Sequence, residues 1–419
     1  MITQTLHVYI LYRCGYVNQA EMVARENIRL CDKVFGRENF WTFRNCNNLA
    51  SILVRLSKLP EAVQLFEDRL KAFEEKFGPE NFETRRSSNI RACLLIQRGN
   101  FTEAEHLLQQ IEKTEQRMLG PDDPFRLRTV ESLGRSLYEQ NRDTEAEVLF
   151  RECAQRWQVQ LGLEHENTLR CWKLVISILF KTARTKDCID VIRPILARLE
   201  EFYGLEHDLT LQWRGKLVVT LHAAEKWSEC ESLGRLQLKL LTIVYNAEDP
   251  RTLLYESLLG FSIKAQKRYP EAAELYIHLS EISRKVLGPE HEDTLKALIN
   301  LAMCYFHDPD HFSDAEALFR ETLCSVNRTS GSSSLLALSI LTLLGKTLYH
   351  RGKLEESANI FRGTLERIKR NLGGLNDEIV MNMEDACGSY LQLIDEIRSA
   401  GTIGYSEDYL ASHFGIYID

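Results

Sequence analysis

One triplet of the sequence has the composition of a nucleotide-binding motif. Gly345-Lys346-Thr347 could end a phosphate-binding loop, in which a lysine and a hydroxyl group contact phosphates. Such a loop also needs a glycine five residues before Gly345, and Ile340 stands there. The triplet falls inside an apolar helical segment, where a glycine lets two helices approach closely. We therefore predict a packing role for Gly345 and no bound nucleotide.

Histidines are the other residues whose spacing could indicate a ligand site. His307 and His311 are four residues apart, as metal ligands on one helix face are, but Pro309 between them interrupts a helix. Three further histidines recur at one phase of a repeat: His165, His207 and His291. They belong to linkers and do not converge, so no metal site is predicted.

Motifs of nucleophilic or metal-assisted catalysis are missing from the sequence. No Gly-x-Ser-x-Gly, His-Glu-x-x-His or Cys-x-x-Cys spacing occurs. Eleven cysteines are scattered between Cys14 and Cys387, mostly at core-facing positions of helices, which is typical of buried thiols. We therefore predict that the chain is not an enzyme and needs no cofactor.

Four arginines recur at intervals of 42 residues and could bind carboxylates: Arg44, Arg86, Arg128 and Arg170. Side chains three, seven and ten residues further along share their helix face. These positions include Asn47, Asn89, Arg135, Tyr138, Lys173 and Phe180. Guanidinium groups bind carboxylates through paired hydrogen bonds, and asparagine amides can hold a peptide backbone. The pattern predicts a groove that binds an extended acidic peptide.

A structural role for the same arginines is the alternative. Arg128 and Arg135 lie three and four residues from Glu131 and could pair with it on their own helix. Further along the chain the corresponding positions turn apolar: Val219, Leu254, Phe261, Met303, Phe306 and Tyr349. We therefore place the predicted groove between residues 44 and 180.

A period of 42 residues positions all of these side chains. Threonines recur at 42, 84, 168, 210, 252 and 294, in linkers such as Leu287-Gly-Pro-Glu-His-Glu-Asp-Thr-Leu295. Glycines keep the same period: Gly36, Gly78, Gly120, Gly162, Gly204 and Gly288. Asn246 stands where the series lacks a glycine, and asparagine tolerates a left-handed backbone almost as well. The linkers are therefore expected to share one turn.

Between consecutive linkers the apolar residues follow a helical period in two segments. A turn such as Arg98-Gly99-Asn100 separates the two segments. Small residues recur in the second helix: Ala20, Ala62, Ala104, Ala146, Cys188, Cys230 and Ala272. Bulky residues follow four positions later: Phe66, Leu108, Phe150, Ile192 and Tyr276. This pattern predicts closely packed antiparallel helices. A one-residue insertion within 307–311 shifts the phase, so Ala315 and Ser357 become the small positions.

The period and its small and bulky positions resemble the tetratricopeptide repeat, and the linkers resemble its kinesin light chain version, which is also common in large fungal proteins. The resemblance implies an all-α, right-handed superhelical solenoid of about ten helix-turn-helix units with a concave groove. It also implies inward asparagines and basic residues that hold cargo peptides carrying a tryptophan among acids. The paired asparagines of the family remain only as Asn47-Asn48, with a lone Asn300.

The ends of the chain give expectations about domain organisation. We predict the repeat array over residues 1–400 and a capping segment or tail over 401–419. Residues 1–14 begin as the first helix of a unit with no polar cap, so a further domain upstream is expected.

The composition of the chain limits the classes of partner and the cellular setting that we expect. Lys and Arg number 52 against 60 Asp and Glu, a net charge of −8, which argues against a nucleic-acid binder. The start is not a signal peptide, and no run of about 18 apolar residues suggests a membrane helix. The scattered, odd number of cysteines favours a reducing, cytoplasmic setting.

The resulting hypothesis is a non-catalytic protein-interaction scaffold or sensor module, which binds an extended, acidic peptide or protein segment in its concave groove. Alternatives are a kinesin light chain-like cargo adaptor, for which the expected coiled-coil heptads are missing, and an accessory protein or enzyme with a small-molecule pocket in the groove. The array could also be the ligand-sensing end of a larger nucleotide-binding receptor.

Overall fold

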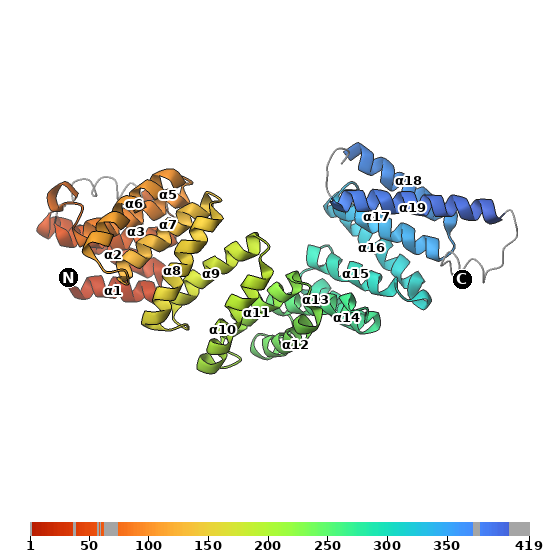
Figure 1. Ribbon diagram of the computed structural model, residues 1–419, viewed down its shortest axis with the longest axis horizontal. Helices are drawn as coiled ribbons and strands as arrows, with labels where there is room; N and C mark the ends of the chain where they lie inside the picture. The colour runs from red at the N-terminus through yellow and green to blue at the C-terminus, as the bar shows by residue number, and fades with distance from the viewer. Residues whose placement is uncertain are drawn as a thin grey trace. The chain divides into compact units, whose positions relative to one another are not determined.

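The computed structural model describes residues 2–36, 39–56, 58, 60–62, 74–371 and 378–401. Every regular element within these residues is helical, so the all-α prediction is confirmed (Figure 1). The helices are α1 (Ile2–Arg13), α2 (Val17–Phe35), α3 (Phe40–Arg55), α5 (Phe82–Gln97), α6 (Phe101–Met118), α7 (Pro124–Glu139), α8 (Asp143–Leu161), α9 (Glu166–Lys181), α10 (Thr185–Tyr203), α11 (Asp208–Ala223), α12 (Trp227–Val244), α13 (Pro250–Ala265), α14 (Tyr269–Val286), α15 (Glu292–Tyr305), the short 3₁₀ helix η1 (Pro309–His311), α16 (Phe312–Thr329), α17 (Leu335–His350), α18 (Leu354–Asn371) and α19 (Glu378–Gly401).

Two compact units divide the chain, residues 1–198 and residues 199–419, with the boundary inside α10. Within each unit a helix packs on the next helix along the chain. The odd-numbered helices, which come first in each helix pair, also touch one another, as α5 and α7 or α13 and α15 do. Several first helices of each compact unit therefore lie side by side.

A recurring set of hydrogen bonds builds the linker between one helix pair and the next. The hydroxyl groups of Thr168 and Thr294 each donate to the carbonyl of the glycine six residues earlier, at 2.8 Å. That glycine has a left-handed backbone, with φ of 93° at Gly162. Asn246 takes the same role with φ of 106°, and Thr252 donates to its carbonyl. The shared turn predicted from the sequence is confirmed at these linkers, whereas Gly120 has no left-handed backbone and Thr210 donates to the carbonyl of Leu199.

Linker side chains also cap the following helix. The ring Nδ1 of His165 accepts a hydrogen bond from the backbone N–H of Asn167 at 3.1 Å. His207 and His291 accept in the same way from the residue two positions later. In other linkers an aspartate or asparagine does so: Asn81, Asp123 and Asp249. The histidines are linker residues, as the sequence predicted, and each satisfies one backbone donor at a helix start.

Removing one cap should have a measurable cost. We expect His165→Ala to lower the free energy of unfolding by about 1 kcal/mol, because the N–H of Asn167 loses its acceptor. His165→Asn should keep nearly full stability, because Asn81 makes the equivalent bond in α5. Urea denaturation of the two variants measures the difference. Equal stability of both would mean that the ring does not act as a cap.

The seam between the two helices of a pair follows the predicted small and bulky positions. Side chains at the small positions are completely buried wherever the structure describes them: Ala20, Ala62, Ala104, Ala146, Cys188, Cys230, Ala272, Ala315 and Ser357. Three glycines of first helices lie against rings of second helices: Gly134 on Phe150, Gly260 on Tyr276 and Gly345 on Phe361. A Cβ atom at Gly345 would lie 2.6 Å from Cε1 of Phe361, so the predicted packing role of this glycine is confirmed.

The turn inside each helix pair has a left-handed residue as well. Gly99 and Gly352 occupy this position with φ of 83° and 72°. At intervals of 42 residues after Gly99 the same conformation is taken by four residues that carry a side chain: Asn141, Ala183, Glu225 and Lys267. An Ala, Glu or Lys in this conformation is strained by about 1–2 kcal/mol relative to the ordinary helical region.

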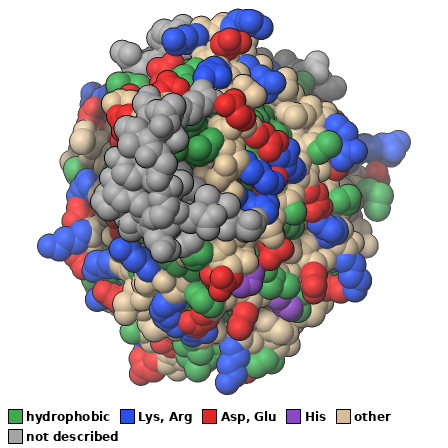
Figure 2. Space-filling model, turned by 90° about the vertical axis from the view of Figure 1, so that its right-hand side faces the viewer, with side chains coloured by type: hydrophobic (Ala, Val, Ile, Leu, Met, Phe, Trp, Pro, Cys, Tyr) green, Lys and Arg blue, Asp and Glu red, His purple; other side chains and the backbone are tan. Residues whose placement is uncertain are grey.

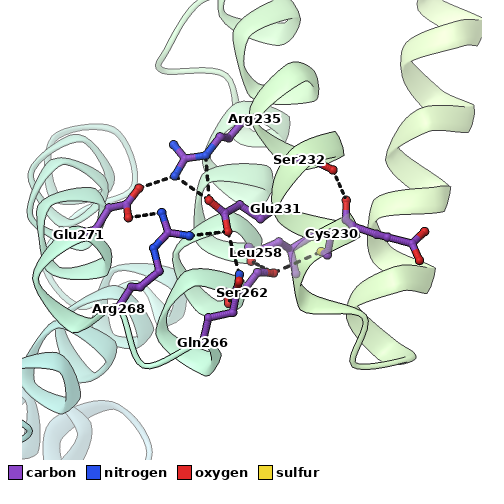
Figure 3. Close-up of polar contacts among 10 residues, drawn as sticks. Cys230, Glu231, Ser232, Arg235, Leu258, Ser262, Gln266, Arg268 and Glu271 are labelled. Atoms are coloured by element: carbon purple, nitrogen blue, oxygen red, sulfur yellow. Dashed lines mark hydrogen bonds and ion pairs between the residues drawn. The ribbon is translucent and has the colours of Figure 1, made fainter.

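A recurring ionic contact joins several helix pairs to the next pair along the chain. In α12, Glu231 accepts hydrogen bonds from Gln266 Nε2 at 2.8 Å and Arg268 Nη1 at 2.7 Å, and Arg235 binds its other oxygen (Figure 3). Burial alone would raise the pKa of Glu231, but these hydrogen bonds outweigh it and lower the pKa. Like Glu231 and Arg268, four other glutamates bind a basic residue 37 positions later: Glu21–Lys58, Glu105–Arg142, Glu147–Arg184 and Glu316–Lys353. Acidic and basic side chains are interspersed over the face shown in Figure 2.

The predicted insertion falls between the two helices of a pair. The 3₁₀ helix η1 (Pro309–His311) occupies it, directly before α16. His311 Nδ1 lies 2.9 Å from Asp308 Oδ2, and the described residues contain no group of three or more side chains that could hold a metal ion. No helix among the described residues is long and apolar enough to cross a membrane.

The C-terminal helix α19 packs on α17 and α18 with apolar side chains such as Val380, Cys387 and Ile394. Exposed residues of α19 include the polar Asp385 and Gln392 and the apolar Ile379 and Met381. The segment predicted to form a cap or tail, residues 401–419, lies outside the described residues beyond position 401.

Candidate functional site

The predicted groove residues lie on three successive first helices, α5, α7 and α9, with Arg44 and Asn47 on α3. Carboxylates bind most of the arginines. Glu131, which is 5% exposed, accepts from Arg170 Nε at 2.9 Å and Nη2 at 2.8 Å. Arg135 Nη2 also donates to Glu131, at 3.1 Å. One buried carboxylate thus holds two of the arginines of the first compact unit.

Glu83 has the equivalent role one helix pair earlier. Its carboxylate lies 3.5 Å from Arg86 Nη1 and 3.8 Å from Arg44 Nε. Arg86 also donates to the side-chain oxygen of Asn48 at 3.0 Å, and the guanidinium of Arg44 lies over the Trp41 ring at 5.6 Å. Arg44 and Arg86 are therefore held by groups of the protein itself.

Arg128 differs from the other arginines. Within the described residues it has no carboxylate partner, although Glu131 follows it on α7. Burial lowers the pKa of Arg128, and the positive charges of Arg170 and Arg86 lower it further against the attraction of Glu131. Because arginine stays protonated in proteins, Arg128 is a charged group without an ion-pair partner among the described residues, and its side chain is exposed. The alternative predicted for Arg135, pairing with Glu131, is present, whereas Arg128 forms no such pair.

A cavity of about 170 Å³ lies beside Arg128 between α5 and α7. Its wall includes Arg86, Asn89 and Arg128, and two rings that pack edge to face at 4.5 Å, Phe82 and Phe125. Two of the predicted arginines and one predicted asparagine are thus brought together around one space.

An ion pair that the sequence did not predict lies in the wall of the same cavity. Arg85 Nη1 donates to Glu115 Oε1 at 3.1 Å, and their side chains are only 7% and 3% exposed. Arg85 Nε and Glu115 Oε2 have no hydrogen-bond partner in the structure. Burial raises the pKa of Glu115, and neither the hydroxyl of Thr129 nor the charge of Arg85 compensates.

The predicted asparagines are largely occupied by the protein. Asn47 is completely buried; its Nδ2 donates to Glu83 at 3.2 Å and its Oδ1 accepts from Ser87 at 2.9 Å. Asn89 Nδ2 donates to Thr129 Oγ1 at 3.0 Å, but Asn89 still lines the cavity. Of the two, Asn89 alone lies at an accessible surface.

The remaining predicted residues lie on α7 and α9. Tyr138 is half-buried beneath Lys181, whose Nζ lies 5.1 Å from the ring centroid. Lys173 is half-buried, and Phe180 is 45% exposed. These three side chains remain predicted groove residues outside the cavity.

Comparisons with known proteins agree with the helix pairs. Family models of the tetratricopeptide repeat match residues 46–83, 126–167, 251–323 and 337–377. Among solved structures, the apo form of RapI is 13% identical and covers 89% of this chain and 98% of its own, with a TM-score of 0.60. The quorum sensor NprR from B. thuringiensis, also in its apo form, is 11% identical over 87% of this chain and 98% of its own, with a TM-score of 0.50.

A third similar structure holds TPR-like repeats of a protein described as a kinesin light chain from Podosopora anserina. It is 21% identical and covers 48% of this chain and 94% of its own, with a TM-score of 0.42. No curated protein sequence matches the chain. The family models thus identify tetratricopeptide repeats in this chain, and its 42-residue period and linkers are similar to those of the kinesin light chain-like type.

Proposed function

We propose that this chain is a non-catalytic module that binds an extended, acidic peptide on the first helices of residues 44–180. The observation that carries the proposal is Arg128, an exposed arginine that forms no ion pair among the described residues and lines a cavity. The peptide would place an aspartate or glutamate at Arg128, with Arg86 and Asn89 beside it. A layer of first helices is the surface that helix-pair arrays offer to partners.

Two thiols lie on the first helices of the proposed groove, Cys93 on α5 and Cys171 on α9. Burial raises the pKa of Cys171 to about 12 and also raises that of Cys93, so neither thiol is an activated nucleophile. The eleven cysteines are odd in number and scattered along the sequence, which supports a reducing compartment such as the cytoplasm. A protein or peptide partner is therefore favoured over a substrate.

Charge reversal at Arg128 tests the proposal. A random peptide library selected against the wild-type chain should yield acidic peptides, and their binding should weaken with salt because exposed charges are screened over about 8–10 Å. Arg128→Glu should weaken binding of these peptides at least tenfold, since a hydrogen bond to a charged group contributes about 1.5–3 kcal/mol. Arg128 is preferable to Arg86 because it holds no other side chain in place.

Arg117→Glu is the matched control, because Arg117 is an exposed arginine on the second helix α6. Peptides should bind this variant and the wild type equally. Selection without acidic enrichment, or acidic peptides that bind Arg128→Glu as well as the wild type, would contradict the proposal.

A further inference from the structure

The second compact unit contains a counterpart of the cavity at Arg128. It lies between α13 and α15, has a volume of about 320 Å³, and most of its lining residues stand at the same repeat positions as those of the first cavity. The two cavities are 168 residues apart, which is four periods of 42 residues. At the equivalent positions the second cavity has Leu253 in place of Arg85, Leu254 in place of Arg86, Ser283 in place of Glu115 and Lys296 in place of Arg128.

The chemistry of the second cavity is apolar. Its lining includes five apolar residues: Pro250, Leu253, Leu254, Leu279 and Leu287. Leu253 and Ser283, both nearly completely buried, replace the ion pair of the first cavity. Leu254 at the wall is 51% exposed, so an apolar side chain faces solvent where the first unit has Arg86.

The charged residues of this cavity already neutralise one another. Lys296 Nζ lies 2.6 Å from Glu292 Oε1 and 3.9 Å from Asp293 Oδ1. His291 Nδ1 accepts a hydrogen bond from the backbone N–H of Asp293. Unlike Arg128, none of these groups is left without a counter-charge, so an acidic ligand group would gain little here.

We infer that this cavity binds the side chain of a leucine or phenylalanine from a peptide partner. A cavity of about 150 Å³ lined by apolar residues can already hold benzene, so the present volume accommodates either side chain. The hydroxyl of Ser257, which has no hydrogen-bond partner among the described residues, lies in the wall and can bond the peptide backbone. The inference concerns a different cavity from that at Arg128 and does not depend on it.

Blocked single amino acids test this site directly. In the full-length chain with labelled leucine methyl groups, N-acetyl-leucinamide and N-acetyl-phenylalaninamide should shift the NMR signals of Leu253, Leu254 and Leu279. N-acetyl-glutamate amide should leave them unchanged. Leu254→Arg should weaken both apolar probes at least tenfold, because it places a charge where their side chain would be buried.

Leu236→Arg is the matched control, because Leu236 is an exposed leucine of α12 that does not line the cavity. It should bind the probes as the wild type does. Absence of shifts at the cavity leucines, or equal binding to Leu254→Arg, would overturn the inference. Arg128→Glu should bind the apolar probes unchanged, so failure here is distinguishable from failure of the acidic-peptide proposal.

A double substitution gives the second cavity the buried charges of the first. Leu253→Arg with Ser283→Glu introduces the ion pair of the first cavity into the second unit. The variant should lose at least tenfold in affinity for N-acetyl-phenylalaninamide while it keeps its helix content by circular dichroism. Undiminished affinity in the folded variant would show that the probe binds elsewhere.

Discussion

Replacing Gly345 by leucine should lower the free energy of unfolding by about 3 kcal/mol, among the largest effects of a single substitution in this chain. Even the Cβ atom would lie 2.6 Å from Cε1 of Phe361, a completely buried ring. Helices α17 and α18 would have to separate, although leucine is the better helix former. Urea denaturation followed by circular dichroism measures the loss.

Gly388→Leu is the matched control for this prediction. Gly388 also lies within a helix, α19, but no atom lies within 4 Å of the position of its Cβ. The substitution should therefore raise stability by up to about 1 kcal/mol through helix propensity. Adding Phe361→Ala to Gly345→Leu should restore part of the loss by making room. Similar stabilities of Gly345→Leu and Gly388→Leu would disprove the close contact.

Breaking the buried ion pair should have a comparable effect. Glu115→Ser leaves the guanidinium of Arg85, whose side chain is 7% exposed, without its carboxylate, and we expect a loss of about 3–5 kcal/mol. Arg85→Leu together with Glu115→Ser should lose little or even gain stability, because two buried charges are removed together. The double variant reproduces Leu253 and Ser283 of the second unit. A double variant as unstable as Glu115→Ser would contradict this prediction.

The same pair predicts a dependence on pH. Burial raises the pKa of Glu115 above its ordinary value of 4.5, so the folded chain holds this proton more tightly than the unfolded chain does. The contribution of Glu115 to stability is therefore present below pH 4.5 and is lost as the pH rises through the folded-state pKa. The double variant should lack this component when the unfolding free energies of both proteins are compared between pH 4.5 and 7.

The repeat could be predicted because its determinants are close in sequence. Thr168 bonds a carbonyl six residues away, and the histidine caps act over two residues. The close approach of Gly345 to Phe361 follows from a spacing of 16 residues within one helix pair. Such local relations recur in every period and are visible as columns of like residues.

The partners of the arginines could not be predicted in the same way. Glu131 was recognised as a neighbour of Arg128 and Arg135 on α7, but its stronger partner, Arg170, comes from the next first helix, 39 residues later. Glu115 of α6 meets Arg85 only because α5 and α6 pack together. The recurring contact over 37 residues, as between Glu231 and Arg268, did leave a signal in the sequence: a glutamate follows the small residue of the second helix.

The left-handed turns have a consequence for turnover of the protein. Ala183, Glu225 and Lys267 occupy this conformation in three consecutive helix pairs, whereas Gly99 and Gly352 occupy it without strain. In a repeat array the cost of opening a segment depends on that segment and its neighbours. The interior of the chain therefore holds a stretch whose local stability is lower than its helix packing alone would allow. A protease that cuts transiently opened helices would find substrate there, and not only at the two ends.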